Sequence, residues 1–141
     1  MAGQLKPFAR VERPFGSNDK VKPMRTVVVI TSLRVLTWWC AVLLAVLSLL
    51  PAHDMVRTSL PGRVEHFIAY AGSAAIAMAG YGATRGAAQI IGGVWVYAGV
   101  LEYLQHFSPG RHPAIGDFAA SALGTVCGGL VIAIVRRRWL A

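Results

Sequence analysis

The chain has 141 residues, of which 55% are hydrophobic and only 14% are charged, and its mean hydropathy is +0.54. Soluble domains usually carry about a quarter charged residues. Here the charges crowd into the first 25 residues, the last few residues and three short breaks, so that long stretches are almost free of charge. This distribution argues against a soluble globular domain and predicts an integral membrane protein.

The net charge of +8 is also a feature of nucleic-acid-binding proteins. The basic residues of this chain, however, lie beside apolar runs, where Lys and Arg mark the cytoplasmic ends of membrane spans. No basic face studded with aromatic residues and no zinc-finger spacing accompanies them. The sequence therefore predicts no nucleic-acid partner.

The cysteines and histidines do not form a recognisable metal motif. Cys40 and Cys127 both fall inside apolar runs, where a thiol usually acts as a small hydrophobic side chain. His66, His106 and His112 are scattered among loop and helix, and no H-E-x-x-H motif is present. We therefore predict neither a metal nor a cofactor.

Residues 1–25 hold six basic and two acidic side chains, and Pro7, Pro14 and Pro23 interrupt any helix. No apolar period runs through this segment. It is predicted to be a disordered, basic, cytoplasmic tail that can touch anionic lipid headgroups. The remaining residues, 26–141, are predicted to form one membrane domain.

Four apolar segments follow, each near the ~20 residues that cross a hydrocarbon core. The first can extend back over residues 26–30, with Arg34 reaching towards the headgroups. A cleaved signal peptide is the competing interpretation, but the long preceding tail and the lack of a cleavage site favour an anchor. The sequence thus predicts an all-α, four-helix transmembrane bundle with spans at about 33–51, 64–82, 87–107 and 114–135.

The orientation follows from the basic residues. The N-terminal tail and Arg136–Arg138 hold most of the positive charge, and Arg85 lies in the short turn between the second and third spans. The positive-inside rule then places both termini in the cytoplasm of a multi-pass protein. The loops 52–63 and 108–113 would face outward.

Small residues in the second, third and fourth spans predict close helix packing. Residues 70–82 are rich in Ala and Gly, and four more small residues recur at spacings of three and four in the last span: Ser121, Gly124, Thr125 and Gly128. Patterns of this kind let helices approach closely in membranes. We interpret these faces as packing surfaces.

Polar residues gather at the predicted outer level of three spans. Glu102, Gln105 and His106 share one helix face by their spacing, and His66 shares a face with Tyr70. A carboxylate inside a span costs about 2.5–3.5 kcal/mol at the bilayer centre and less near the edge. Glu102 is therefore expected to face a partner rather than lipid.

We expect His66, Glu102, Arg111 and Asp117 to lie in one pocket-sized region, with the Arg111 guanidinium above the Glu102 carboxylate. Ionisable groups inside a membrane usually mark functional sites. Two structural alternatives stay open. The cluster can be an ion-paired plug that fixes helix packing, and Asp117 can be an acid favoured by a helix N-terminus.

Two stretches, "RVEHFIAY" (63–70) and "LEYLQHFSPGRHPAIGDFAASALGTVCG" (101–128), resemble the VanZ-like family of small membrane proteins. The resemblance covers about residues 60–135 and lies in the order of the motifs. The family often has acids where this chain has Gly62 and Leu101, and an asparagine where it has Ser121. The matching residues are Arg63, His66, Tyr70, Glu102, Gln105, Gly110, Arg111, Asp117, Gly124 and Gly128.

The resemblance implies a role in the cell envelope, because the family takes its name from a protein linked to resistance to teicoplanin, a glycopeptide antibiotic with a lipid tail. It suggests binding or processing of a polar or anionic group, lipid-linked or related to the cell wall, at the outer membrane surface. Whether the protein is an enzyme or a binding module stays open, and no oligomeric state is predicted. Candidate catalytic residues are Glu102, His66 and Asp117; candidate ligand-binding residues are Arg63, Tyr70, Gln105 and Arg111.

The predicted orientation can be tested by cysteine labelling in intact cells, after Cys40 and Cys127 are replaced by Ala. A Ser108→Cys variant should react with an impermeant maleimide from outside, because loop 108–113 is expected to face outward. A Ser17→Cys variant should react only after permeabilisation. Labelling of Ser17→Cys in intact cells would contradict the orientation.

Overall fold

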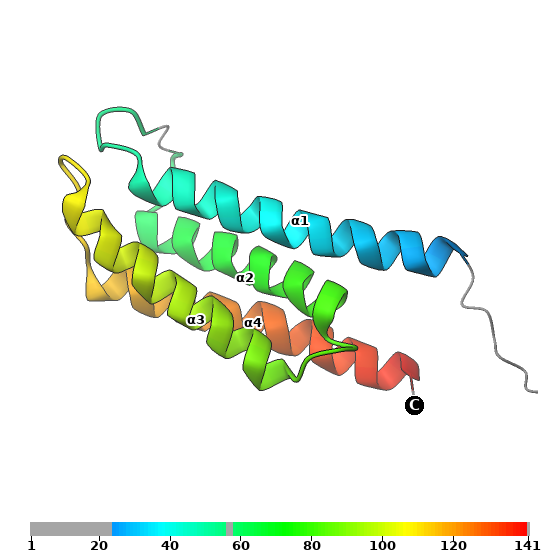
Figure 1. Cartoon of the computed structure of the whole chain (residues 1–141). Helices are drawn as coiled ribbons and strands as arrows, with labels where there is room; N and C mark the ends of the chain where they lie inside the picture. Colours follow the sequence, from blue (N-terminus) through cyan, green and yellow to red (C-terminus); the bar gives the residue numbers. More distant parts are fainter. Residues whose placement is uncertain (1–23, 56–57, 141) are drawn as a thin grey trace, which may run out of the picture.

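The computed structural model describes residues 24–55 and 58–140, and these form helices without any strand. The helices are α1 (Met24–Leu49), α2 (Gly62–Tyr81), α3 (Ala87–Leu104) and α4 (Ile115–Leu140); a 3-10 turn, η1 (Gln105–Phe107), continues α3 (Figure 1). The predicted all-α, four-helix architecture is confirmed. The predicted disordered tail lies, except for its last two residues, outside the described residues.

Three of the helical segments are long and apolar enough to cross a membrane: Met24–Leu49, Ala87–Phe107 and Ile115–Arg138. The first and last helices are longer than their apolar runs predicted. α1 begins at Met24, so it includes Arg25, which had been assigned to the tail, and α4 continues through Arg136–Arg138. Arginine is a good helix former, so hydrogen bonding continues past the point where hydropathy falls.

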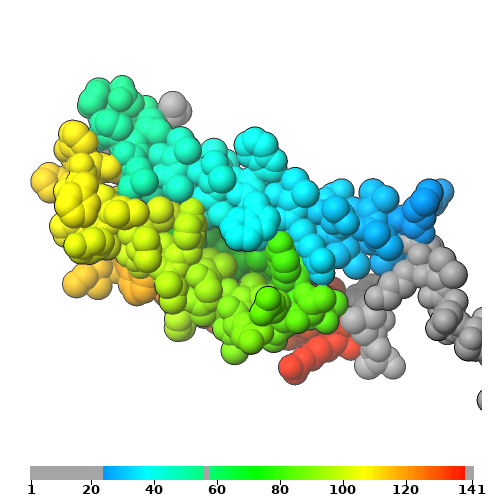
Figure 2. All heavy atoms as spheres, in the orientation of Figure 1, coloured from blue at the N-terminus to red at the C-terminus, as the bar shows by residue number. Residues whose placement is uncertain are grey.

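Helix α2 is the centre of the bundle, because it packs against each of the other three helices (Figure 1). It also contributes most of the buried apolar residues: Tyr70, Ala74, Ala77 and Met78. α1 is the opposite case, since Ser48 is its only buried residue and Trp38 and Trp39 are both more than 60% exposed. In the space-filling view α1 and α3 cover α2, which shows only in the gap between them (Figure 2).

The closest approach in the bundle is between α2 and α4, and glycine makes it possible. A Cβ atom on Gly128 would lie 2.0 Å from the Ala71 carbonyl oxygen, and one on Gly124 would lie 2.3 Å from the Phe67 carbonyl oxygen. The two glycines are four residues apart on α4, as are their partners on α2. This is the small-residue packing that the sequence predicted.

Two arginines bind the carbonyl groups at the end of α2. Arg34 Nε donates to the Gly80 oxygen (3.1 Å), and Arg136 Nη1 donates to the Met78 oxygen (3.0 Å). The last carbonyls of a helix have no partner within it and favour a cation. Arg34 is half-buried between α1 and α2, with its guanidinium over the Tyr81 ring. Its reach towards headgroups stays a prediction, and the structure adds these protein partners.

The glycine contact predicts a specific difference between two Gly→Ala substitutions. Gly128→Ala should lower the thermal unfolding midpoint in detergent, because overpacking typically costs about 1–3 kcal/mol. Gly93→Ala is the matched control: it lies within α3, where a Cβ would meet nothing within 4 Å. If the two variants unfolded at the same temperature, the close α2–α4 contact would be refuted.

Candidate functional site

A cavity of about 230 Å³ lies where α1 ends and α2 begins; we call it the α1–α2 cavity. Three of the predicted site residues line it, namely His66, Tyr70 and Arg111. Its other lining residues are Leu44, Leu47, Ser48, Met55, Thr58, Glu65 and Ala69. The cavity therefore combines ionisable groups with an aliphatic wall.

Arg111 lies at this cavity because the loop 108–113 folds onto the end of α1. Its Nη2 atom donates to the carbonyl oxygens of Leu47 (3.0 Å) and Ser48 (2.9 Å), and Ser108 Oγ donates to the Leu49 oxygen (2.8 Å). Gly110 turns the loop with a φ of 73°, a conformation that glycine adopts without strain. The loop thus satisfies the last carbonyls of α1 and holds a guanidinium beside them.

The expected position of Arg111 above Glu102 is not what the structure shows. Glu102 Oε1 accepts a hydrogen bond from the backbone N–H of Ala114 (2.7 Å), directly before α4. Glu102 lines a different depression, about 420 Å³ between α3 and α4, together with His106. The prediction from the sequence considered only the charges of side chains. In the structure, backbone groups at helix ends are the partners of both Glu102 and Arg111.

Asp117 lies in the first turn of α4, as the helix N-terminus interpretation proposed. One of its oxygens is 3.9 Å from Arg63 Nε, and the Arg63 guanidinium also lies over Gly116. The Arg63 side chain is 73% exposed, and ion pairs of this kind contribute about 0–1 kcal/mol. Arg63 and Asp117 link α2 to α4, and neither lines the α1–α2 cavity.

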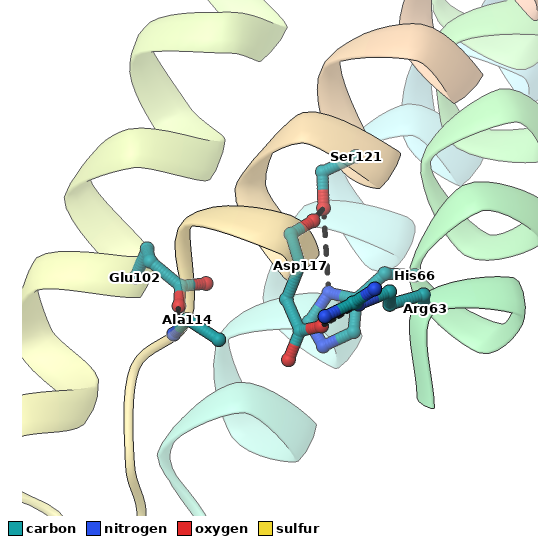
Figure 3. A network of polar contacts seen from close by, with 6 residues as sticks. All are labelled: Arg63, His66, Glu102, Ala114, Asp117 and Ser121. Atoms are coloured by element: carbon teal, nitrogen blue, oxygen red, sulfur yellow. Dashed lines mark hydrogen bonds and ion pairs between the residues drawn. The ribbon is translucent and has the colours of Figure 1, made fainter. Parts of the chain in front are cut away.

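His66 connects the cavity to α4 through Ser121 (Figure 3). Ser121 Oγ is 3.3 Å from His66 Nδ1 and 2.9 Å from the Asp117 carbonyl oxygen. The Ser121 hydroxyl donates its hydrogen to the Asp117 carbonyl oxygen. Ser121 Oγ then accepts from His66, so Nδ1 carries the hydrogen and Nε2 of the neutral ring is left as an acceptor. Ser121 is 2% exposed, so its hydroxyl serves helix packing and orients the histidine.

Tyr70 lies one turn below His66, and the two rings are stacked with their centroids 6.4 Å apart. Tyr70 is buried in the bundle. Gln105 is also buried, but it lines neither the cavity nor the α3–α4 depression. The predicted site residues therefore do not form one cluster, since only His66, Tyr70 and Arg111 line the α1–α2 cavity.

Sequence reasoning missed Glu65 and Thr58, which line the same cavity. The Thr58 hydroxyl and backbone N–H both donate to Glu65 Oε1, which holds this carboxylate at the first turn of α2. Glu65 was visible as an acid next to His66. Thr58 carried no such signal, because its role depends on how the loop before α2 folds.

Within residues 24–55 and 58–140, no group of three His, Cys, Asp or Glu side chains is placed to hold a metal ion. His106 and His112 are exposed, and His53 pairs with the neighbouring Asp54 at 3.2 Å. Comparison of the chain with family models, with curated proteins and with solved structures finds no match.

The contact between Glu102 and Ala114 predicts different effects for two substitutions. Glu102→Ala should lower stability in detergent by about 1 kcal/mol, because an N–H at the start of α4 loses its acceptor. Glu102→Gln should be close to wild type, since its amide oxygen can still accept that bond. Equal destabilisation by both substitutions would instead show that the charge of Glu102 matters.

Proposed function

We propose that this chain is a multi-pass membrane protein of the cell envelope that binds the polar head of an amphiphilic ligand in the α1–α2 cavity. The observation that carries the proposal is the composition of the cavity wall. Glu65, His66 and Arg111 line one part of it, and Leu44 and Leu47 line another. A ligand with a polar head and an apolar chain matches both parts.

The polar groups favour a head with hydroxyl or anionic oxygens. The Arg111 guanidinium offers positive charge and planar donors, which suit phosphate or carboxylate oxygens. His66 Nε2 can accept from a hydroxyl, or donate when the ring is charged. Catalysis is less well supported, because Ser121 and Glu102 already hydrogen-bond to the backbone.

We propose α2 as a fourth span. Its 20 residues extend about 30 Å, the thickness of a hydrocarbon core. It falls outside the set of helices apolar enough to span by composition, yet it contacts the three other helices and its second half, residues 70–81, is largely buried. A helix that faces protein rather than lipid needs less hydrophobicity.

The proposed orientation has the termini in the cytoplasm of a bacterial plasma membrane. All four carboxylates of the described residues lie at the end of the bundle near loop 108–113, namely Asp54, Glu65, Glu102 and Asp117. Arg85 and Arg136–Arg138 lie at the other end. The order of the motifs supports VanZ-like membership, and with it a link to teicoplanin resistance; both are proposals that rest on those motifs.

A second candidate function is a non-catalytic structural or accessory bundle. Three of the charged residues that suggested a site complete helix ends: Glu102 and Asp117 at the start of α4, and Arg111 at the end of α1. In this alternative the polar groups fix helix packing, and the α1–α2 cavity holds no specific ligand.

Filling the cavity separates the two candidates without removing a charge. Ala69→Phe places a ring in the α1–α2 cavity, whereas Ala119→Phe adds the same ring at an exposed position near the start of α4. Mass spectrometry of lipid extracts from the purified proteins should show a co-purifying amphiphile that Ala69→Phe loses and Ala119→Phe retains.

Glu65→Gln separates the two kinds of head. The amount of an anionic amphiphile should rise, because a like charge leaves the cavity wall, whereas that of a neutral, hydroxyl-bearing one should fall, because a strong acceptor is lost. Identical lipid profiles for wild type and Ala69→Phe, with both proteins folded, would leave only the structural candidate.

A further inference from the structure

A larger cavity, of about 460 Å³, lies at the opposite end of the bundle, between the α2–α3 turn and the last turns of α4. Three arginines line it: Arg85 from the turn, and Arg136 and Arg137 from α4. In Figure 2 the end of α4 projects beneath the α2–α3 turn at this end of the molecule. We call this feature the basic pocket.

The arginines of the basic pocket differ in what holds them. Arg136 is fixed by its bond to the Met78 carbonyl and by packing against Gly82, where a Cβ would lie 2.2 Å from Nη1. The Arg85 and Arg137 side chains form no hydrogen bond or ion pair with other described residues. One guanidinium is therefore prepositioned, and two have donors left for a ligand.

No carboxylate in the described parts of the chain offsets this charge at the basic pocket. None of its lining residues is acidic, and the first turn of α3 contains no acid. Gly86 and Ala87, which also line the pocket, begin this 18-residue helix, so its N-terminal dipole adds positive potential. The pocket is therefore a concave site of one charge sign, which attracts anions.

We propose that the basic pocket binds the phosphate of an anionic membrane phospholipid. Arginine guanidinium groups suit phosphate because they present planar, bidentate donors. Next to the pocket, α4 exposes the aliphatic side chains of Val131, Ile134 and Val135, along which acyl chains can lie. A phosphate site at the end of apolar helices matches the level of lipid headgroups. The assignment is independent of the ligand of the α1–α2 cavity.

The test measures binding of phosphatidylglycerol, with phosphatidylcholine as the reference lipid, to the full-length protein in a neutral detergent by native mass spectrometry. Arg85→Gln/Arg137→Gln should weaken phosphatidylglycerol binding by about 5-fold per arginine, hence roughly 25-fold for the pair. The matched control, Arg25→Gln/Arg138→Gln, removes two exposed arginines that do not line the pocket, and it should bind like wild type.

Two further arms keep the result unambiguous. Arg85→Lys/Arg137→Lys retains the charge but not the planar bidentate donors, so it should bind more tightly than the Gln pair and less tightly than wild type, which separates loss of a site from loss of the fold. Equal weakening in the pocket and control variants would overturn the proposal in favour of diffuse electrostatic attraction. Displacement of phosphatidylglycerol by millimolar inorganic phosphate alone would also overturn it, since the site would then take free phosphate.

Discussion

The close contact between the backbones of α2 and α4 is the constraint on which the rest of the structure depends. Gly124 and Gly128 let the two helices approach until a single added carbon would clash with a carbonyl oxygen. The same approach sets His66 beside Ser121 and Arg63 beside Asp117. The polar contacts between these helices are thus a consequence of glycine packing, which brings side chains from the first turns of α2 and α4 within reach of one another.

Unsatisfied backbone groups explain the placement of four further charged residues. Each helix leaves carbonyls at one end and N–H groups at the other, and near a hydrocarbon core these need protein partners. Arg34 and Arg136 bind the end of α2, Arg111 binds the end of α1, and Glu102 binds the N–H of Ala114. The structural roles of these residues are therefore visible without any ligand.

The number and order of the helices could be predicted from the sequence because apolar runs of near-membrane length are a strong signal. The ends of the helices were harder to predict, because Arg25 and Arg136 are polar but still lie within helices. The small-residue spacing of Gly124 and Gly128 predicted close packing, and Figure 3 shows the polar contacts at that interface.

The composition of the candidate site was only partly predictable. His66, Tyr70 and Arg111 do line one cavity, but Glu102 does not. The difference arises because Glu102 and Arg111 each hydrogen-bond to a nearby backbone group instead of pairing with each other. Pairing by charge is a long-range argument, whereas the geometry of a loop such as 108–113 decides which acceptor a side chain actually reaches. Thr58 lines the cavity because the loop before α2 folds so that Thr58 donates to Glu65, and this fold is not evident from the sequence.

The partial burial of α2 determines where polar side chains of the bundle find protein partners. A polar residue on a lipid-facing helix has few partners, and α1 accordingly exposes mostly aliphatic and tryptophan side chains. The second half of α2 is buried by other helices, whereas Glu65 and His66 lie in its partly exposed first turns, where Thr58 and Ser121 are their partners. The helix that falls outside the set apolar enough to span by composition thus carries the binding groups. They line the α1–α2 cavity because α1 leaves the first turns of α2 partly uncovered.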